Sequence, residues 1–264
     1  MQYKTVIFDL DGTLLNTLDD LAGATNYALV QHGLPTRTKD EVRWFVGNGI
    51  RNLIKRAVPA EASAELQEQV YATFNTYYKA HCNDKTKAYD GIMELLAALR
   101  EAGCRTAIVS NKADYGVQEL VKQYFAGQLD AACGEREGIA KKPAPDMLFA
   151  VMEKLGAEKN ATIYIGDSDT DIETARNAGI PCISACWGFR GRDFLVQHGA
   201  KLLAENPQPD ADIDAVRLME TISFFFGEEL RAGMLIQQLD YANRHDSLTG
   251  IYNRNAMEKD LELY

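Results

Sequence analysis

Short apolar runs rich in β-branched residues alternate along this chain with longer stretches of helical periodicity, and this alternation limits the fold more than any other feature of the sequence. Apolar runs of this length are typical of strands that are buried on both faces. Their alternation with helices favours a parallel sheet wrapped by helices, which is an α/β fold. Five strands are predicted, over residues 4–10, 105–111, 130–135, 162–168 and 181–187.

The interval between the first two predicted strands breaks this rhythm. It holds about ninety residues, whereas a crossover between parallel strands needs only about a dozen. Residues 16–82 show helical patterns throughout, and they predict a helical cap that is inserted after the first strand as a separate, lid-like subdomain. The α/β core is then expected to consist of residues 1–15 and 83–212.

Composition and charge exclude several classes of protein. The 264 residues are 46% hydrophobic and 25% charged, as in an ordinary globular chain. A net charge of −10 argues against binding to nucleic acid, which requires a basic face. The longest apolar run, residues 222–226, is too short to span a bilayer, and the N-terminus leads straight into a strand instead of a signal peptide. Five scattered cysteines without a C-x-x-C pair indicate reduced thiols, so we expect a cytoplasmic protein with no membrane partner.

Two carboxylates follow the first predicted strand, in the stretch VIFDLDGTLLNT. Asp9 and Asp11 are two residues apart, so on an extended chain their side chains point to the same side. Ligands of open α/β sheets bind at the carboxyl ends of the strands, where these residues are expected. A single Asp there can also be a turn or capping residue, and Asp-x-Asp-Gly can form a calcium-like loop. Three further motifs favour a catalytic role.

A second acidic motif follows the fourth predicted strand, in TIYIGDSDTDIETARNAG. Asp167, Ser168 and Asp171 come directly after the strand. Any one of them could cap the next helix, but a cap needs only one such residue. Clustered carboxylates repel one another unless a hard cation lies among them, and Mg²⁺ is the usual cation beside phosphate substrates.

The other two motifs are weak when taken alone. Lys142 lies in KKPAPDML, where two prolines stiffen the chain before a helix. A lysine held there is a fixed positive charge suited to a phosphate or a carboxylate, while Lys141 beside it is expected in solvent. Ser110 and Asn111 end the predicted strand AIVSN, where a hydroxyl can donate to a phosphate oxygen.

Taken together and in this order, the four motifs resemble those of the haloacid-dehalogenase-like hydrolases, and the resemblance covers residues 3–209. It implies a Rossmann-like core with the helical cap inserted after the first motif. The stretches VGNGIRNLIKRAVP, KPAPDML, GDSDTDIETARNAG and WGFRGRDFLVQHGAKLLAENP look like the phosphoglycolate phosphatase branch. The dehalogenase branch lacks an acid at the position of Asp11.

The resemblance implies a Mg²⁺-dependent phosphomonoester hydrolase that acts on a small phosphorylated metabolite. Asp9 is expected to attack phosphorus and to form an aspartyl phosphate. Asp11 is expected to protonate the leaving oxygen and then to assist water. Lys142, Ser110 and Asn111 would bind the phosphoryl oxygens, with Lys142 also stabilising charge in the transition state.

The same resemblance implies a metal site and leaves some alternatives open. Mg²⁺ would be held by the side chains of Asp9 and Asp167 and by the backbone carbonyl of Asp11. Asp171 and Ser168 would lie around the metal, with Asp171 orienting either a metal-bound water or Lys142. Pyrophosphatase, nucleotidase and sugar-phosphate mutase activities are alternatives on the same core.

The cap is expected to select the substrate. Gly47-Asn48-Gly49 predicts a flexible turn that dips into the active site, so Asn48 is a candidate substrate ligand. Arg51 or Arg56 could meet a substrate carboxylate, although arginines on amphipathic helices are usually solvated. Residues 187–190, WGFR, either form a wall of the site or pack without contacting it.

The C-terminal part of the sequence indicates a second module. Residues 213–245 predict a connector helix, a C-terminal helical extension through which the chain could form a homodimer. Residues 246–264, beginning with DSLTGIYNRN, resemble the truncated start of a GGDEF domain. The match consists of Asp246, Leu248, Thr249, Gly250, Asn253 and Arg254. An alternative function is therefore the sensor part of a GGDEF signalling protein, although no other stretch resembles the cyclase active site.

Overall fold

The computed structural model describes residues 3–47 and 49–207. In this part of the chain, parallel strands form a six-stranded sheet with the order β5-β4-β1-β6-β7-β8. This arrangement confirms the predicted α/β class. The strands are β1 (Thr5–Phe8), β4 (Arg105–Ala113), β5 (Ala131–Glu135), β6 (Thr162–Gly166), β7 (Cys182–Ala185) and β8 (Leu202–Ala204).

The register of the central strands brings the motif residues to one edge of the sheet. Phe8 at the end of β1 pairs with Ile108 of β4 on one side and with Ile165 of β6 on the other. The residues that follow in all three strands therefore reach the same edge, because parallel strands share one direction. All four residues of β1 are buried, as expected for a strand that is covered on both faces.

Two details of the sheet differ from the sequence prediction. β1 ends at Phe8, because the chain turns back at Leu10, whose carbonyl accepts hydrogen bonds from the N–H groups of residues 13–15. A sixth strand, β8, lies at the edge beside β7. Its three residues are only half-buried, and so short a run carries little strand signal in the sequence.

Helices connect the strands of the sheet along the chain. In the core they are α5 (Ile92–Glu101), α6 (Asp114–Tyr124), α7 (Asp146–Leu155), α8 (Asp169–Ala178) and α9 (Arg192–Gln197), with a 3₁₀ turn at Lys159–Ala161. Met147 and Leu148 of α7 and Ala175 of α8 pack in one cluster with Val109 and Tyr164 of the sheet. α7 and α8 each end at a glycine in the left-handed conformation, which is a common way for a helix to end.

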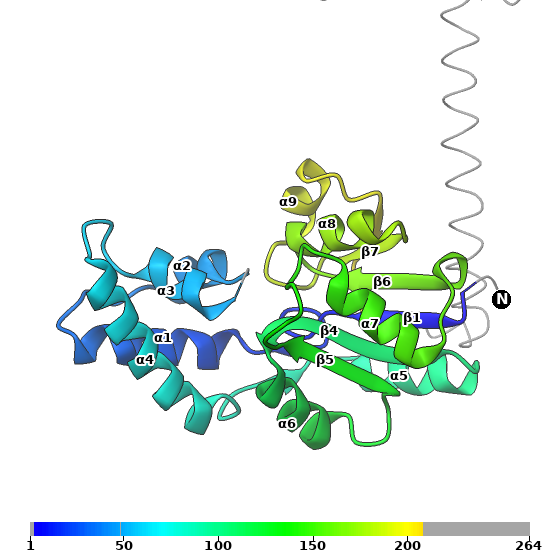
Figure 1. The fold of residues 1–264 in the computed structure, drawn as a ribbon, viewed down its shortest axis with the longest axis horizontal. Coiled ribbons are helices and arrows are strands. Elements are labelled where there is room, and N and C mark those ends of the chain that lie inside the picture. The colour runs from blue at the N-terminus through cyan, green and yellow to red at the C-terminus, as the bar shows by residue number, and fades with distance from the viewer. Residues whose placement is uncertain (1–2, 48, 208–264) are drawn as a thin grey trace, which may run out of the picture. The chain divides into compact units, whose positions relative to one another are not determined.

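Four further helices fill most of the segment predicted as a cap, and we call them the cap helices. They are α1 (Leu18–Gln31), α2 (Lys39–Phe45), α3 (Ile50–Ala57) and α4 (Ala64–His81). They have an apolar core of their own, which includes the fully buried Leu29, Val42 and Phe74. In Figure 1 they lie beyond the carboxyl ends of the strands, on the side where the motifs are placed.

The chain enters and leaves the cap helices at one point. The short strands β2 (Leu15–Asn16) and β3 (Lys87–Ala88) pair there in antiparallel fashion. Beside them, the buried carboxylate of Asp20 accepts hydrogen bonds from the backbone N–H groups of Lys85 and Thr86 and from the Thr86 hydroxyl. These contacts tie the two linkers together at the entrance of the cap.

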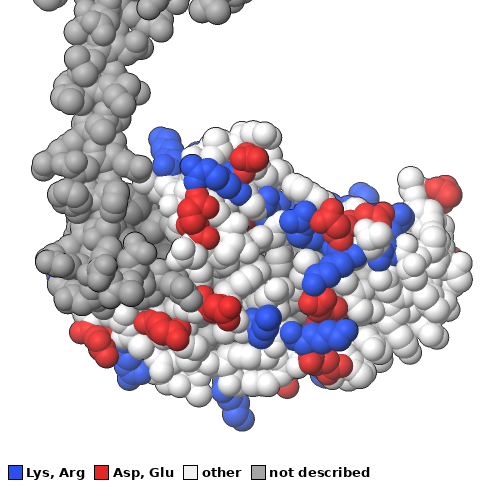
Figure 2. All heavy atoms as spheres, turned by 180° about the vertical axis from the view of Figure 1, so that it is seen from behind, with Lys and Arg blue, Asp and Glu red and all other residues white. Residues whose placement is uncertain are grey.

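Several predictions fall on residues that the structure does not describe. Asn48, the connector helix at 213–245 and the GGDEF-like segment at 246–264 lie outside the described residues and stay predictions. None of the described helices is both long and apolar enough to cross a membrane. All five cysteines lie among the described residues, and none of them forms a disulfide bond. On the face shown in Figure 2, acidic and basic side chains lie intermixed.

Candidate active site

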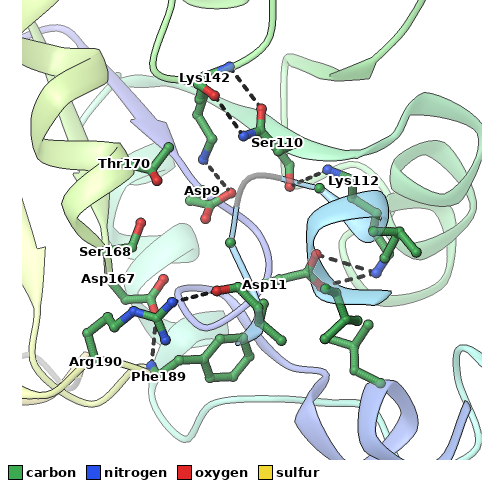
Figure 3. A pocket seen from close by; sticks show the side chains of 17 residues that line it. Asp9, Asp11, Ser110, Lys112, Lys142, Asp167, Ser168, Thr170, Phe189 and Arg190 are labelled. Atoms are coloured by element: carbon green, nitrogen blue, oxygen red, sulfur yellow. Dashed lines mark hydrogen bonds and ion pairs between the residues drawn. The ribbon is translucent and has the colours of Figure 1, made fainter. Parts of the chain in front are cut away.

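The four sequence motifs meet in one cavity at the carboxyl edge of the sheet (Figure 3). Asp9 follows β1, Ser110 lies in β4 and Asp167 follows β6. Lys142 reaches the same place from the segment before α7. These four side chains are buried, with exposed fractions of 2–8%. A cavity that brings together this many ionisable groups below the protein surface is a candidate for catalysis.

Three carboxylates gather around a single lysine in this cavity. Asp9, Asp167 and Asp171 each place a carboxylate oxygen within 4.8 Å of the others. Lys142 Nζ lies 2.9 Å from Asp9 Oδ1 and 2.7 Å from Asp171 Oδ1. Burial raises the pKa of Asp9 to about 7, because Lys142 offsets only part of the effect. Burial, with Asp171 and Asp9 nearby, also raises the pKa of Asp167 well above its usual range. The excess of negative charge favours a bound cation.

Lys142 is held in place by its backbone as well as by its ammonium group. The Asn111 carboxamide oxygen accepts a hydrogen bond from Lys142 N, and the amide nitrogen donates to Lys142 O. The Tyr164 hydroxyl, on β6, lies 3.1 Å from Lys142 Nζ. The Asn111 side chain thus supports the lysine, while its predicted role as a phosphate ligand stays a prediction. Sequence reasoning missed Tyr164, whose only signal is an aromatic residue in an otherwise aliphatic strand.

Asp171 contacts Lys142, which is one of the two partners that the sequence left open. Its Oδ1 accepts the hydrogen bond of Lys142, while its Oδ2 accepts hydrogen bonds from the Ser168 N–H and, at 2.6 Å, from the Ser168 hydroxyl. The second set of bonds forms a capping box at the start of α8. Asp171 therefore orients Lys142 and caps its own helix at the same time. Ser168 lines the cavity beside it.

Asp167 is fixed by the loops on either side of it. Its carboxylate accepts hydrogen bonds from the Thr13 hydroxyl, at 3.2 Å, and from the Phe189 N–H, at 2.6 Å. Gly12 and Gly188 approach it closely, and a Cβ atom at Gly12 would lie 2.3 Å from Asp167 Oδ2. Because neither glycine has a side chain, the Asp167 carboxylate fits into the space beside them.

We expect Gly12→Ala to lower phosphatase activity and to destabilise the protein by more than the ~1 kcal/mol cost of a left-handed alanine. Gly12 has a φ of +89°, and the new methyl group would displace Asp167. Gly127→Ala is the matched control, since Gly127 also has a positive φ, +74°, but faces open space. Urea unfolding and activity assays of both variants test this. Equal losses in the two variants would contradict it.

Asp11 lies apart from the three clustered carboxylates and has a different cation. Lys112 Nζ lies 3.1 Å from Asp11 Oδ1 and donates to the Tyr78 hydroxyl of α4 at 2.7 Å. Burial would lower the pKa of Lys112, but Asp11 and Tyr78 together raise it above its usual value, so the side chain is an ammonium group. Sequence reasoning missed Lys112. The available signal was its position two residues after Ser110, which places both side chains on the same side of β4.

Residues of the cap helices and of the turn between α2 and α3 line one side of the cavity, and most of them are apolar. Val46, Gly47, Gly49, Ile50 and Leu53 line this side. Arg51, a predicted substrate ligand, is not among the residues that line this cavity. It lines a second cavity together with Tyr78 and Lys112, and its role in substrate binding stays a prediction. Its guanidinium forms an ion pair with Glu68 and lies 4.0 Å from the centre of the Tyr71 ring.

The loop after β7 connects the core with the cap helices. Arg190 donates hydrogen bonds to the carbonyls of Arg43 and Val46, at the end of α2. Phe189 lines the cavity and packs in the apolar core of the cap helices. The indole N–H of Trp187 donates to the Thr13 carbonyl, and Trp187 is not a lining residue. In WGFR, therefore, Phe189 and Arg190 form a wall of the site, while Trp187 supports the loop of the first motif.

The arrangement fits a hard divalent cation. Three buried carboxylates converge from two strand ends and one helix start, and only oxygen ligands are offered by this cluster. Oxygen donors of this kind suit Mg²⁺ more than they suit Zn²⁺, which takes nitrogen or sulfur ligands in most sites. Asp9, Asp167 and Asp171 are the residues whose carboxylates could hold such a cation.

Several known proteins are similar to this chain in sequence and in fold. The profile of the family described as "Haloacid dehalogenase-like hydrolase" matches residues 6–185. A phosphoglycolate phosphatase from Xanthomonas campestris pv. campestris (strain 8004) is 34% identical over 206 residues, covering 77% of this chain and 93% of the relative. An N-acetylmuramic acid 6-phosphate phosphatase from Pseudomonas aeruginosa is 29% identical over 215 residues, covering 81% and 95%. A solved structure from Lactobacillus delbrueckii subsp. bulgaricus, with a provisional phosphoglycolate phosphatase name, has a TM-score of 0.76 and 37% identity, covering 78% of this chain and 96% of that one.

The fold, the buried cluster of carboxylates and lysine, and these relatives together define the protein as a phosphatase. The chain belongs to the haloacid dehalogenase-like hydrolase family. Among its relatives it is similar to the phosphoglycolate phosphatases.

Proposed function

We propose that this phosphatase is Mg²⁺-dependent, that it acts through a phosphorylated Asp9, and that its substrate is 2-phosphoglycolate. The observation that carries the proposal is the position of Asp9. It is buried at the carboxyl edge of the sheet, with Lys142 2.9 Å away and with Asp11 two residues further along the chain. A nucleophile, a charge partner and an acid are thus supplied within one cavity.

The chemistry follows from these positions. A carboxylate oxygen of Asp9 attacks phosphorus, and the bond from phosphorus to the leaving oxygen breaks. Asp11 gives its proton to that oxygen, which departs as an alcohol. Asp11 then takes a proton from a water molecule as the water attacks the aspartyl phosphate, and this step releases inorganic phosphate and restores Asp9.

Two further groups stabilise the charge that is redistributed in this transfer. Lys142 and the Ser110 hydroxyl line the cavity beside Asp9 and are placed to bind phosphoryl oxygens. Mg²⁺, held by Asp9 and Asp167, would offset the negative charge of the phosphate and of the clustered carboxylates. The raised pKa values of Asp9 and Asp167 support this role, because a cation would keep both groups ionised.

The choice of substrate is supported by the relatives and by the apolar residues that line one side of the cavity. The phosphoglycolate phosphatase from Xanthomonas aligns over 93% of its own length. Leu53 and Ile50 of α3 and Phe189 of the core wall the side away from the phosphate site, which favours a small leaving group. The P. aeruginosa relative is named for a larger sugar phosphate, so sugar phosphates belong in any test of specificity.

A substrate screen with and without metal tests the proposal. We expect activity on 2-phosphoglycolate to be at least about tenfold higher, in kcat/KM, than on N-acetylmuramic acid 6-phosphate, nucleoside monophosphates, pyrophosphate or an aryl phosphate. Chelation with EDTA should abolish this activity and added Mg²⁺ should restore it, because the carboxylate cluster needs a cation. The measurement is phosphate release.

The outcomes of this screen separate the parts of the proposal. Preference for another phosphomonoester would replace the substrate and keep the reaction class. Full activity in EDTA would contradict the metal. Transfer of the phosphoryl group to a sugar, without release of phosphate, would favour a mutase.

A further inference from the structure

Lys112 is a buried cation that the phosphoryl chemistry described above does not use. Its side chain is 5% exposed, at the end of β4, and lies between the core and the cap helices. The ammonium group contacts both carboxylate oxygens of Asp11, at 3.1 and 3.4 Å, and the hydroxyl of Tyr78, at 2.7 Å. A buried ammonium group is costly unless it has partners, so its retention beside Asp11 calls for a function.

The position of Lys112 is defined relative to the leaving group of the substrate. Asp11 is the residue placed to protonate the leaving oxygen, so that oxygen must come within hydrogen-bonding distance of its carboxyl group. Lys112 Nζ is 3.1 Å from Asp11 Oδ1 and lines the same cavity. In 2-phosphoglycolate the carboxylate carbon is two covalent bonds from the leaving oxygen. A carboxylate there would lie beside the Lys112 ammonium group.

The other cations of this cavity are bound elsewhere. Lys142 is held between Asp9 and Asp171 on the phosphate side. Arg190 donates to backbone carbonyls at the end of α2. Of the three cationic side chains that line the cavity, Lys112 is therefore the one in contact with Asp11. Gly49 and Ile50, at the start of α3, line the same cavity, and the positive end of this helix also favours an anion.

We propose that Lys112 is a specificity-determining residue that binds the carboxylate of a small phosphorylated hydroxy acid, next to the leaving oxygen. The inference rests on the proposed function, which it deepens by naming the group that distinguishes the substrate from a neutral phosphomonoester. The Tyr78 hydroxyl, from α4, holds the ammonium group in position. The cap helices thus contribute to recognition through Tyr78.

The test compares two substrates of nearly the same size, 2-phosphoglycolate and 2-hydroxyethyl phosphate, which has an alcohol in place of the carboxylate. The quantity measured is the ratio of their kcat/KM values, for the full chain with Mg²⁺. We expect Lys112→Gln to lower this ratio about 10- to 100-fold, as for loss of a charge-assisted hydrogen bond. Lys122→Gln, which removes an exposed lysine on α6, is the charge-matched control and should keep the wild-type ratio.

Each outcome decides a different point. If Lys112→Gln lowers kcat/KM for both substrates by the same factor, Lys112 only positions Asp11 and the inference is overturned. If the wild-type enzyme does not prefer 2-phosphoglycolate, the substrate assignment fails and the inference fails with it. Should Lys112→Gln not fold, as judged by circular dichroism, Tyr78→Phe keeps the ammonium group and removes one of its partners. We expect this variant to lower the ratio in the same direction, and an unchanged ratio overturns the inference.

Discussion

Asp9→Asn is expected to lower kcat on any phosphomonoester by about 10⁴-fold or more, because the substituted residue has no carboxylate to attack phosphorus. The fold should survive the change. Asparagine is nearly the same size, and Asp9 is one of three clustered carboxylates whose charges repel one another. Phosphate release and circular dichroism of the purified variant measure the two effects.

A surface aspartate provides the control for this substitution. Asp19, on α1, forms an ion pair with Lys39, and both side chains are about half exposed. Asp19→Asn should change neither activity nor, by more than about 0.5 kcal/mol, the free energy of unfolding. Near-normal activity of Asp9→Asn would rule out Asp9 as the nucleophile.

Lys142→Met should be the most damaging of the single substitutions to stability, and it should also lower activity. The lysine side chain is 3% exposed and neutralises Asp9 and Asp171, so its loss leaves two buried carboxylates without their cation. Breaking a buried pair in this way costs about 3–5 kcal/mol of unfolding free energy. The loss of Lys142 should also raise the pKa of Asp9 further, since this lysine is the main group that lowers it. We expect kcat to fall at least about 100-fold.

Lys141, the residue next to Lys142, provides the matched control for this substitution. Lys141 is 39% exposed and pairs with Glu135 at 3.6 Å. Lys141→Met removes the same charge from the adjacent position, and an exposed pair of this kind contributes about 0–1 kcal/mol. Urea unfolding of the two variants measures the difference. Similar losses for both would show that the burial of Lys142 has no special effect on stability.

The sequence predicted the edge of the sheet at which the site lies. Asp9, Ser110 and Asp167 each stand at the end of a buried apolar run, and strands that are joined through helices run in parallel. Their carboxyl ends must then share one edge. The alternation of runs and helical patterns, together with the residue types at the ends of the runs, was enough to infer this.

The sequence was less informative wherever a side chain had more than one partner within reach. Asn111 was predicted to bind phosphate and Arg51 to bind the substrate, and the sequence did not show that their side chains also pair with the Lys142 backbone and with Glu68. Lys112 directly follows two predicted site residues, Ser110 and Asn111, but its own sequence position does not show that its side chain is buried. Its burial depends on Tyr78, more than thirty positions earlier in the chain.

The sequence by itself determined the class of fold, the helical insert and the motif residues that meet at one edge of the sheet. These depend on local periodicity and on the order of motifs, which are properties of short stretches of chain. Only the tertiary structure decided which lysine pairs with which carboxylate. Lys142 lies between Asp9 and Asp171, and Lys112 lies beside Asp11. The physical reason is that these pairs join residues more than twenty positions apart, and only packing of the cap helices and the sheet determines which charges are buried together.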